Sequence, residues 1–350
     1  MNTVKAYAAI DANSPLKFHP IERRDLREND VEIDIKYCGV CHSDLHIARN
    51  EWGGTTYPIV PGHEIVGTVK SVGSKVTKFK VGDKVGVGCL VDSCQKCHCC
   101  HEGLEQFCEN GMVGTYGGID LIDQTPTQGG YSTSIKVREE FVLRIPDNLP
   151  LAEAAPLLCA GITTYSPLKH WKVGPGSKVA VIGLGGLGHM AVKIAKAMGG
   201  EVTVISQSLR KKEDGLRLGA SHYYASSDEN TFSQLANTFD LIINTVSAKL
   251  DLNPYLSLLR LDGAMVLLGI PPEAPTVMAQ QLIFKRRSLS GSLIGGIKET
   301  QEMLDFCSKH DIVSDVEVIP MEYINEAYER MLKGDVKYRF VIDINSFEGM

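Results

Sequence analysis

A glycine-rich segment constrains the fold of this chain more than any other feature. Gly183-Leu184-Gly185-Gly186-Leu187-Gly188 follows an apolar stretch that predicts a strand, and it opens a stretch that predicts a helix. Glycines at these positions allow a tight turn, close backbone approach to a pyrophosphate and close packing of the helix, whose N-terminus stabilises negative charge. Alone the pattern is weak, and a glycine-rich turn without a ligand is the alternative. Its place between strand and helix favours a dinucleotide site.

The segments around this turn alternate between strand and helix patterns from about residue 160 to 290. The expected helices are Leu187–Met198 and one that ends near Leu218-Gly219. The expected strands are Ser177–Ile182, Val202–Ser206, His222–Ala225, Phe239–Asn244 and Gly263–Leu268. Such βαβ alternation predicts a parallel, doubly wound sheet.

The first 150 residues have a different pattern. Short alternating or glycine-punctuated segments, such as Val31–Ile35, Ile65–Val72 and Val81–Val87, predict an irregular, mostly antiparallel β domain, and Met1–Ala8 predicts an edge strand. The last sixty residues hold two helical patterns and the strand Arg339–Asp343, and we expect them to return to this domain. The predicted domains are therefore residues 1–155 with 294–350, and residues 156–293.

The end of the second predicted strand indicates which nucleotide binds. An NAD site would place Asp or Glu about 20 residues after the glycines, to accept hydrogen bonds from the ribose 2′-hydroxyl. Here that acid is absent, and hydroxyls and cations follow instead: Ser206, Ser208, Arg210, Lys211 and Lys212. These groups would attract a 2′-phosphate. Although Arg210–Lys212 could simply be a solvated helical turn, the missing acid favours NADP(H).

Five of the ten cysteines fall within fifteen residues. Cys94, Cys97, Cys100 and Cys108 have the spacing C-x2-C-x2-C-x7-C, which suits a closed tetrahedral zinc site of structural type. Cys99 is an adjacent fifth thiol, so a register that uses it stays open, and His98 and His101 lie nearby. Disulfides are disfavoured because residues 1–30 lack a signal-peptide pattern, and an iron–sulfur cluster because no other redox signature accompanies the cysteines.

Charge and hydropathy exclude several other classes of protein. A net charge of −6 gives no reason to expect nucleic acid or an anionic membrane as a partner, and no apolar run is long enough to span a bilayer. We therefore expect a cytoplasmic protein.

Three further segments carry candidate metal ligands. They are Cys38-Gly39-Val40-Cys41-His42-Ser43-Asp44-Leu45-His46, Gly62-His63-Glu64 and Leu158-Cys159-Ala160-Gly161. At these residues the chain resembles the zinc-containing medium-chain alcohol dehydrogenases, and in particular the cinnamyl-alcohol-dehydrogenase branch with its bacterial broad-specificity aldehyde reductases. The resemblance covers almost the whole chain. It implies a GroES-like catalytic domain combined with a Rossmann domain, and a GroES-like fold for the irregular β-rich part.

The resemblance implies that Cys41, His63 and Cys159 bind a catalytic zinc, while Cys38 packs on its strand. A Cys2His site with an open fourth position is the arrangement known for alcohol dehydrogenase. Asp44 and Glu64 are implied as carboxylates behind the ligands, with Asp44 orienting the imidazole of His63.

The same resemblance implies a proton relay and contacts to cofactor and substrate. Hydride passes from NADPH to a zinc-bound aldehyde, and Ser43 and His46 carry the proton that the product needs. His42 and Arg339 contact the pyrophosphate, and Thr163 supports the nicotinamide. The implied substrate-pocket residues are Trp52, Leu90 and Ile294, although Trp52 could equally be ordinary core.

The predicted function is thus a zinc-dependent oxidoreductase with two zinc ions per chain that reduces aldehydes with NADPH. A non-catalytic zinc-stabilised redox sensor or structural protein, a zinc-ribbon binding module and a zinc-free quinone reductase are the alternatives. The presence of Cys41, His63 and Cys159 disfavours the sensor or structural protein and the zinc-free quinone reductase. The acidic net charge disfavours the zinc-ribbon module. Ser288–Gly295 predicts an edge strand that pairs across a twofold axis in a homodimer.

Overall fold

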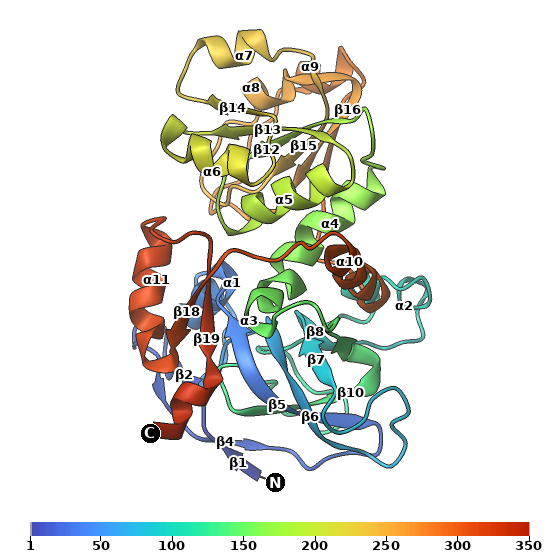
Figure 1. The fold of residues 1–350 in the computed structure, drawn as a ribbon, viewed down its shortest axis with the longest axis vertical. Helices are drawn as coiled ribbons and strands as arrows, with labels where there is room; N and C mark the ends of the chain where they lie inside the picture. Colours follow the sequence, from blue (N-terminus) through green and yellow to red (C-terminus); the bar gives the residue numbers. More distant parts are fainter. Residues whose placement is uncertain (1, 350) are drawn as a thin grey trace. The chain divides into compact units, whose positions relative to one another are not determined.

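The computed structural model describes residues 2–349 and divides the chain into two compact units (Figure 1). One unit comprises Met1–Cys159 with Gly295–Met350, and the other comprises Ala160–Ile294. Within residues 2–349, no helix has the length and apolar character needed to cross a membrane.

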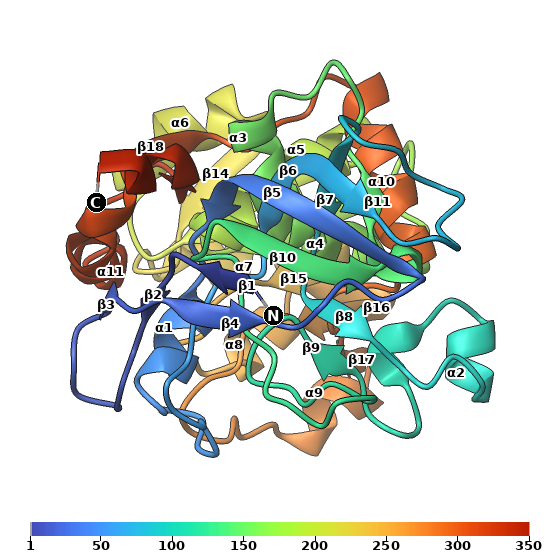
Figure 2. The same ribbon diagram turned by 90° about the horizontal axis from the view of Figure 1, so that it is seen from below.

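The first unit is built on a seven-stranded sheet with the order β11-β7-β6-β5-β19-β18, and β10 also pairs with β5. Figure 2 shows β5 and β10 side by side. Two-stranded sheets join β1 to β4, β2 to β3 and β8 to β9. The strands are β1 Asn2–Val4, β2 Tyr7–Ala8, β3 Lys17–Phe18, β4 Ile21–Arg23, β5 Asp30–Gly39, β6 Ile65–Val72, β7 Lys84–Val87, β8 Leu90–Asp92, β9 Val113–Gly114, β10 Ser134–Arg138, β11 Leu143–Arg144, β18 Val316–Pro320 and β19 Arg339–Asp343. The helices are α1 His42–Ala48, α2 His98–His101, α3 Leu151–Ala154, α10 Ile297–Lys309 and α11 Ile324–Leu332, with 3-10 turns at Glu105–Phe107, Glu139–Phe141, Ala155–Leu158, Met321–Tyr323 and Ile344–Gly349.

The strand β5 organises this unit around the site described below. It pairs with β6 through Cys38 and Ile65, and with β19 through Gly39 and Val341, both antiparallel. The carboxyl end of β5 therefore lies beside the amino ends of β6 and β19. Residues just beyond these strand ends are brought together for that reason, although they are far apart in the sequence.

The second unit contains a six-stranded parallel sheet with the order β14-β13-β12-β15-β16-β17. Its strands are β12 Lys178–Ile182, β13 Glu201–Ser206, β14 His222–Ala225, β15 Phe239–Asn244, β16 Leu259–Leu267 and β17 Ser288–Gly291. Its helices are α4 Ala160–His170, α5 Gly186–Ala197, α6 Lys212–Arg217, α7 Asn230–Gln234, α8 Asn253–Leu256 and α9 Ala279–Ile283, with a 3-10 turn at Leu209–Lys211. Counted along the chain, this is the order 3-2-1-4-5-6 of a dinucleotide-binding fold, so the predicted doubly wound sheet is confirmed.

Apolar residues on both faces explain why the parallel sheet is buried. Val179, Val181 and Ile242 are wholly inaccessible to solvent. The strands read as continuous Val- and Ile-rich runs because helices cover both faces of such sheets.

The prediction for the N-terminus was only partly right. Two short strands, β1 and β2, replace the single edge strand, and they pair with different partners, β4 and β3. Met1 lies outside the described residues.

Candidate active site

Two thiols, an imidazole and a carboxylate meet at the strand ends of the first unit. One ligand atom each of Cys41, His63, Glu64 and Cys159 lies within 4.8 Å of all the others. Cys41 follows β5 and begins helix α1, His63 and Glu64 directly precede β6, and Cys159 follows the 3-10 turn Ala155–Leu158. His63, Glu64 and Cys159 are buried and Cys41 is 9% exposed. This donor set matches the thiolate and imidazole ligands that zinc prefers.

Hydrogen bonding within this group favours an ionised thiol. The Cys159 thiol lowers the pKa of Cys41 well below its ordinary value, against the effect of burial, and His63 lowers it further. A thiolate is the form of cysteine that binds metal. Cys38, in contrast, is wholly buried on β5, and burial raises the pKa of its thiol well above the ordinary value.

Asp44 is completely buried directly behind the ligands. Its Oδ1 lies 3.0 Å from Nδ1 of His63, and its Oδ2 accepts a hydrogen bond from the backbone N–H of Cys41 at 2.8 Å. The Asp44 carboxylate thus contacts the side chain of one ligand, His63, and the backbone N–H of another, Cys41. It fixes the orientation of the His63 ring, which leaves the Nε2 atom of that ring for a metal.

Glu64 and Arg339 form a buried ion pair beside the thiols. Burial raises the pKa of Glu64 to about 7, although Arg339 opposes the change. Burial would lower the pKa of Arg339, but the charges of Glu64, Cys41 and Cys159 raise it above its ordinary value. Gly39 is required here because a Cβ at that position would lie 1.9 Å from Glu64 Oε2. Arg339 begins β19 and its guanidinium holds this carboxylate.

Helix α1 carries the two residues expected to move protons. Ser43 Oγ lies 3.7 Å from Cys41 Sγ, and both Ser43 and His46 are partly exposed. His46 Nδ1 lies 2.5 Å from Glu51 Oε2, and its ring stacks at 5.0 Å on the ring of Trp52. His42, on the same helix, is exposed.

The three expected substrate-pocket residues differ in environment. Trp52 is 46% exposed, so it is not ordinary core, while Leu90 is buried on β8. Ile294 is buried in the second unit and has a φ of +36°, a conformation that β-branched residues seldom adopt.

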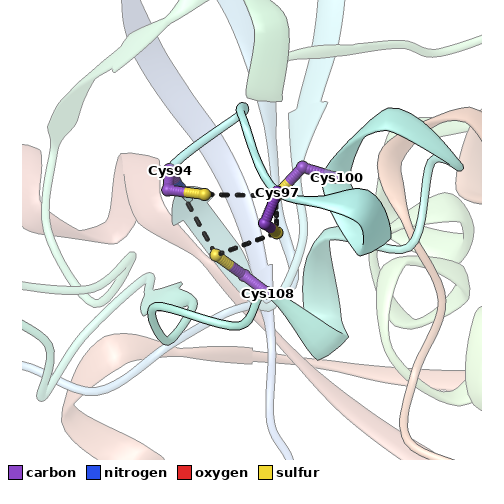
Figure 3. A group of neighbouring side chains, drawn as sticks. All are labelled: Cys94, Cys97, Cys100 and Cys108. Carbon is purple, nitrogen blue, oxygen red and sulfur yellow. Dashed lines mark hydrogen bonds between the residues drawn. The ribbon is translucent and has the colours of Figure 1, made fainter.

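The four cysteines of the loop after β8 form a second cluster (Figure 3). The Sγ atoms of Cys97 and Cys100 are 3.5 Å apart, and Cys94–Cys100 and Cys97–Cys108 are both 4.0 Å apart. Backbone N–H groups of Lys96 and Cys97 and the Asn110 side chain lower the pKa of Cys94 to about 6. Cys99 lies on α2 outside this group, so the geometry favours the register through Cys100.

The glycine-rich turn joins β12 to α5 in the second unit. Gly183 has a φ of +87°, and a Cβ on Gly188 would lie 2.1 Å from the Gly183 carbonyl oxygen. A Cβ on Gly185, in contrast, would meet no atom within 4 Å. Gly183 and Gly188 thus serve the turn and its packing, whereas Gly185 leaves open space for a ligand at the amino end of α5. Gly186 and Leu187 follow Gly185 as the first residues of that helix.

The residues expected to determine the preference for NADP(H) lie at the end of β13 and directly after it. Ser206 ends β13, Ser208 caps the 3-10 turn by accepting the N–H of Arg210 at 3.4 Å, and Lys211 Nζ donates to the carbonyl of Leu184 at 3.1 Å. This last bond joins the basic segment to the glycine-rich turn. Thr163 lies buried on α4 of the same unit.

Sequence reasoning missed three contacts of this site. Glu51 contacts His46, the hydroxyl of Tyr131 donates to Asp44 at 3.2 Å, and the ring of Tyr116 lies 5.7 Å from that of His63. The only available signal was the proximity of Glu51 to His46 in sequence. The two tyrosines flank the 117–130 loop, and nothing local to them indicates the contact.

Comparisons with known proteins agree with this geometry. Residues 27–147 match the alcohol dehydrogenase GroES-like domain, and residues 186–309 match the zinc-binding dehydrogenase family. The chain is 64% identical to NADP-dependent alcohol dehydrogenase C 1 of Mycolicibacterium smegmatis, with 99% of each chain covered, and 54% identical to the aldehyde reductase YahK of Escherichia coli, with 97% of this chain and 98% of the relative covered. It is 46% identical to the cinnamyl alcohol dehydrogenase of Helicobacter pylori, whose structure was solved with NADP(H), with a TM-score of 0.93 and 98% of each chain covered. The resemblance and the combined GroES-like and Rossmann fold inferred from the sequence are confirmed, and the chain belongs to the zinc-binding alcohol dehydrogenases.

Proposed function

We propose that this protein interconverts aldehydes and primary alcohols with NADP(H), acting mainly as an aldehyde reductase. The observation that carries the proposal is the convergence of Cys41, His63 and Cys159 at one buried point. Two thiols and one imidazole would supply three ligands to a zinc ion, and because Glu64 is held by Arg339 a further position would be available to substrate. The sensor and structural alternatives require no such open site.

The chain offers a suitable environment for zinc at this point. Asp44 holds the His63 ring, hydrogen bonding favours the Cys41 thiolate, and Arg339 balances negative charge beside the thiols. When bound, zinc would polarise the aldehyde carbonyl as a Lewis acid, and the nicotinamide would supply the hydride. We propose that Glu64, paired with Arg339, adjusts the charge around the ligands.

Proton movement falls to helix α1 in this proposal. Ser43, next to Cys41, is suited to contact the substrate oxygen, and His46 is suited to exchange a proton with solvent because its side chain is partly exposed. Glu51 holds the His46 ring through Nδ1, which leaves Nε2 for the relay. We propose that Trp52, which is 46% exposed, and the buried Leu90 belong to the wall of the substrate pocket, which would favour apolar aldehydes.

We propose that the nicotinamide cofactor carries a 2′-phosphate. Ser206, Ser208, Arg210 and Lys211 stand where an NAD site would place an acid. The M. smegmatis relative is named for NADP, and the H. pylori structure holds NADP(H). Backbone amides of the glycine-rich turn, together with His42, Arg339 and Thr163, are proposed to bind the rest of the cofactor.

Cofactor oxidation with one aromatic and one aliphatic aldehyde tests this function. We expect turnover that favours NADPH over NADH and that chelation abolishes. Arg210→Ala should raise the KM for NADPH about tenfold and leave that for NADH unchanged, while Arg217→Ala on α6 should change neither. Absence of turnover in zinc-loaded protein would contradict the proposal.

We also propose that Cys94, Cys97, Cys100 and Cys108 hold a second, structural zinc. The contacts between their sulfurs and the lowered pKa of Cys94 support a tetrathiolate site. Because none of the ten cysteines forms a disulfide and six of them are proposed zinc ligands, we propose a reducing, cytoplasmic location.

A homodimer is the proposed assembly. β17 is the last strand of the parallel sheet, and nearby Ile283, Phe284 and Leu293 are 72%, 79% and 42% exposed. An edge strand beside exposed apolar side chains suits pairing with its own copy across a twofold axis. Light scattering that gives the mass of a single chain would rule this out.

A further inference from the structure

The buried carboxylate of Asp44 accepts hydrogen bonds from the segments that carry the metal ligands and also from a residue outside them. Three donors belong to the ligand segments: the His63 ring at 3.0 Å, the Cys41 N–H at 2.8 Å and the Gly62 N–H at 3.1 Å. The fourth is the hydroxyl of Tyr131, which donates to Oδ2 at 3.2 Å although it lies 87 residues away in the sequence. Tyr131 is wholly inaccessible to solvent.

The backbone around Tyr131 is tied to the segment that carries His63. The N–H of Tyr131 donates to the Pro61 carbonyl at 3.0 Å, and that of Gly130 donates to the Gly62 carbonyl at 2.9 Å. The ring also packs on Gly62, where an added Cβ would lie 2.7 Å from Tyr131 Cδ1. Tyr131 therefore holds this segment through its backbone, its ring and, by way of Asp44, its hydroxyl.

A buried carboxylate depends on its hydrogen bonds, because no water replaces one that is lost. Burial and the nearby Asp44 raise the pKa of Tyr131 well above its ordinary value, so the hydroxyl keeps its proton and remains a donor. Without it, Asp44 loses a donor to Oδ2, while the Cys41 N–H at 2.8 Å and the nearby Tyr116 remain beside the carboxylate. The carboxylate is then less firmly oriented toward His63.

We propose that Tyr131 is a positioning residue for the catalytic metal, acting through Asp44 to hold the His63 imidazole and the Cys41 backbone in ligating geometry. This inference rests on the proposed function, since it requires a metal at Cys41, His63 and Cys159. Tyr131 itself touches neither metal nor substrate in this proposal. Its effect is on how tightly and in what geometry the metal is held.

The test is Tyr131→Phe, which removes only the oxygen atom. In protein loaded with zinc, we expect the metal at the catalytic site to pass to a chelator about tenfold faster than in the wild type, with the four-cysteine site unaffected. With cobalt in the catalytic site, the visible absorption bands should shift because the ligand geometry changes. Tyr255→Phe, which removes a hydroxyl from a tyrosine buried in the second unit, should change neither measurement.

A double-mutant cycle with Asp44→Asn checks the route. If Tyr131 acts through Asp44, the release rate of the double variant should be close to that of Asp44→Asn alone. Wild-type release and an unchanged cobalt spectrum in a folded Tyr131→Phe would overturn the inference. So would a variant that fails to fold, because the hydroxyl would then serve the fold and not the metal. Wild-type protein that binds metal only at the four cysteines would instead contradict the proposed function.

Discussion

His46 Nδ1 and Glu51 Oε2 lie 2.5 Å apart at the solvent end of the proposed proton relay. Both side chains are partly exposed, and the His46 ring also stacks on Trp52. A carboxylate at this atom fixes the tautomer and the direction of the ring. We therefore include Glu51 with Ser43 and His46 in the proposed proton relay, where it orients the His46 ring.

The first prediction concerns that contact. Glu51→Gln should lower kcat for aldehyde reduction about tenfold and leave KM nearly unchanged, because proton delivery is weakened while substrate contacts stay. Steady-state kinetics with NADPH measure both values. The matched control is Glu28→Gln, which removes the charge of an exposed glutamate paired with Lys75. Equal effects of the two variants would contradict a role for Glu51.

The second prediction separates the two possible registers of the cysteine loop. Cys100→Ser should lose one zinc ion per chain and lower the melting temperature, because a closed zinc site contributes folding energy. Cys99→Ser should keep both ions. Elemental analysis of purified protein measures the content. Loss of zinc in Cys99→Ser would show that the alternative register is used.

A third prediction contrasts two glycines of one turn. Gly188→Ala should destabilise or unfold the second unit, since its Cβ would lie 2.1 Å from a carbonyl oxygen. Gly185→Ala should melt close to the wild type yet bind NADPH at least tenfold more weakly, because its Cβ would occupy the space proposed for the pyrophosphate. Thermal melts and NADPH titration by fluorescence distinguish the two. Normal NADPH binding by Gly185→Ala would refute the proposed role of this turn.

The fourth prediction is a pH dependence of stability. Asp120 fastens the loop between Tyr116 and Tyr131 to Arg27, with contacts of 2.8 and 3.0 Å. Burial would raise the pKa of Asp120, but Arg27 and the backbone N–H groups of Asp123 and Ile122 lower it to about 2. A folded pKa below the unfolded one stabilises the fold at pH values above about 4, and this stabilisation is lost as the pH falls toward 2.

Asp120→Asn should therefore lower the melting temperature at pH 7, and the difference from the wild type should shrink as the pH falls below 4. Asp147→Asn, at a wholly exposed position, should match the wild type throughout. A difference for Asp120→Asn that grows toward acid would contradict the sign of this effect.

The sequence predicts the second unit well because its signals are local. Strand β13 was expected at Val202–Ser206 and spans Glu201–Ser206, since an apolar run between turn residues defines a buried parallel strand. The N-terminal segment was less predictable, because pairing partners of short strands depend on distant residues such as those of β3 and β4.

The candidate site, too, is predictable from the sequence only in part. The cysteine spacing predicts the four-cysteine loop, and the family resemblance implies Cys41 and His63. The contact between Tyr131 and Asp44, in contrast, exists only because Gly129–Tyr131 lies alongside Val60–Gly62. The φ of +36° at Ile294 is likewise not predictable from the sequence, because β-branched residues seldom adopt a positive φ. Interactions set by tertiary structure leave little trace in local patterns.

The most direct test of the central claim is the zinc content and turnover of Cys159→Ser, which removes one proposed catalytic ligand and leaves the four-cysteine loop intact. Zinc per chain and NADPH-dependent aldehyde reduction are measured on the same preparation, beside the wild type. We expect two zinc ions and turnover in the wild type, and in the variant one zinc ion with turnover lowered at least a hundredfold. Turnover at the wild-type rate in Cys159→Ser would contradict the claim that Cys41, His63 and Cys159 hold the metal that activates the carbonyl.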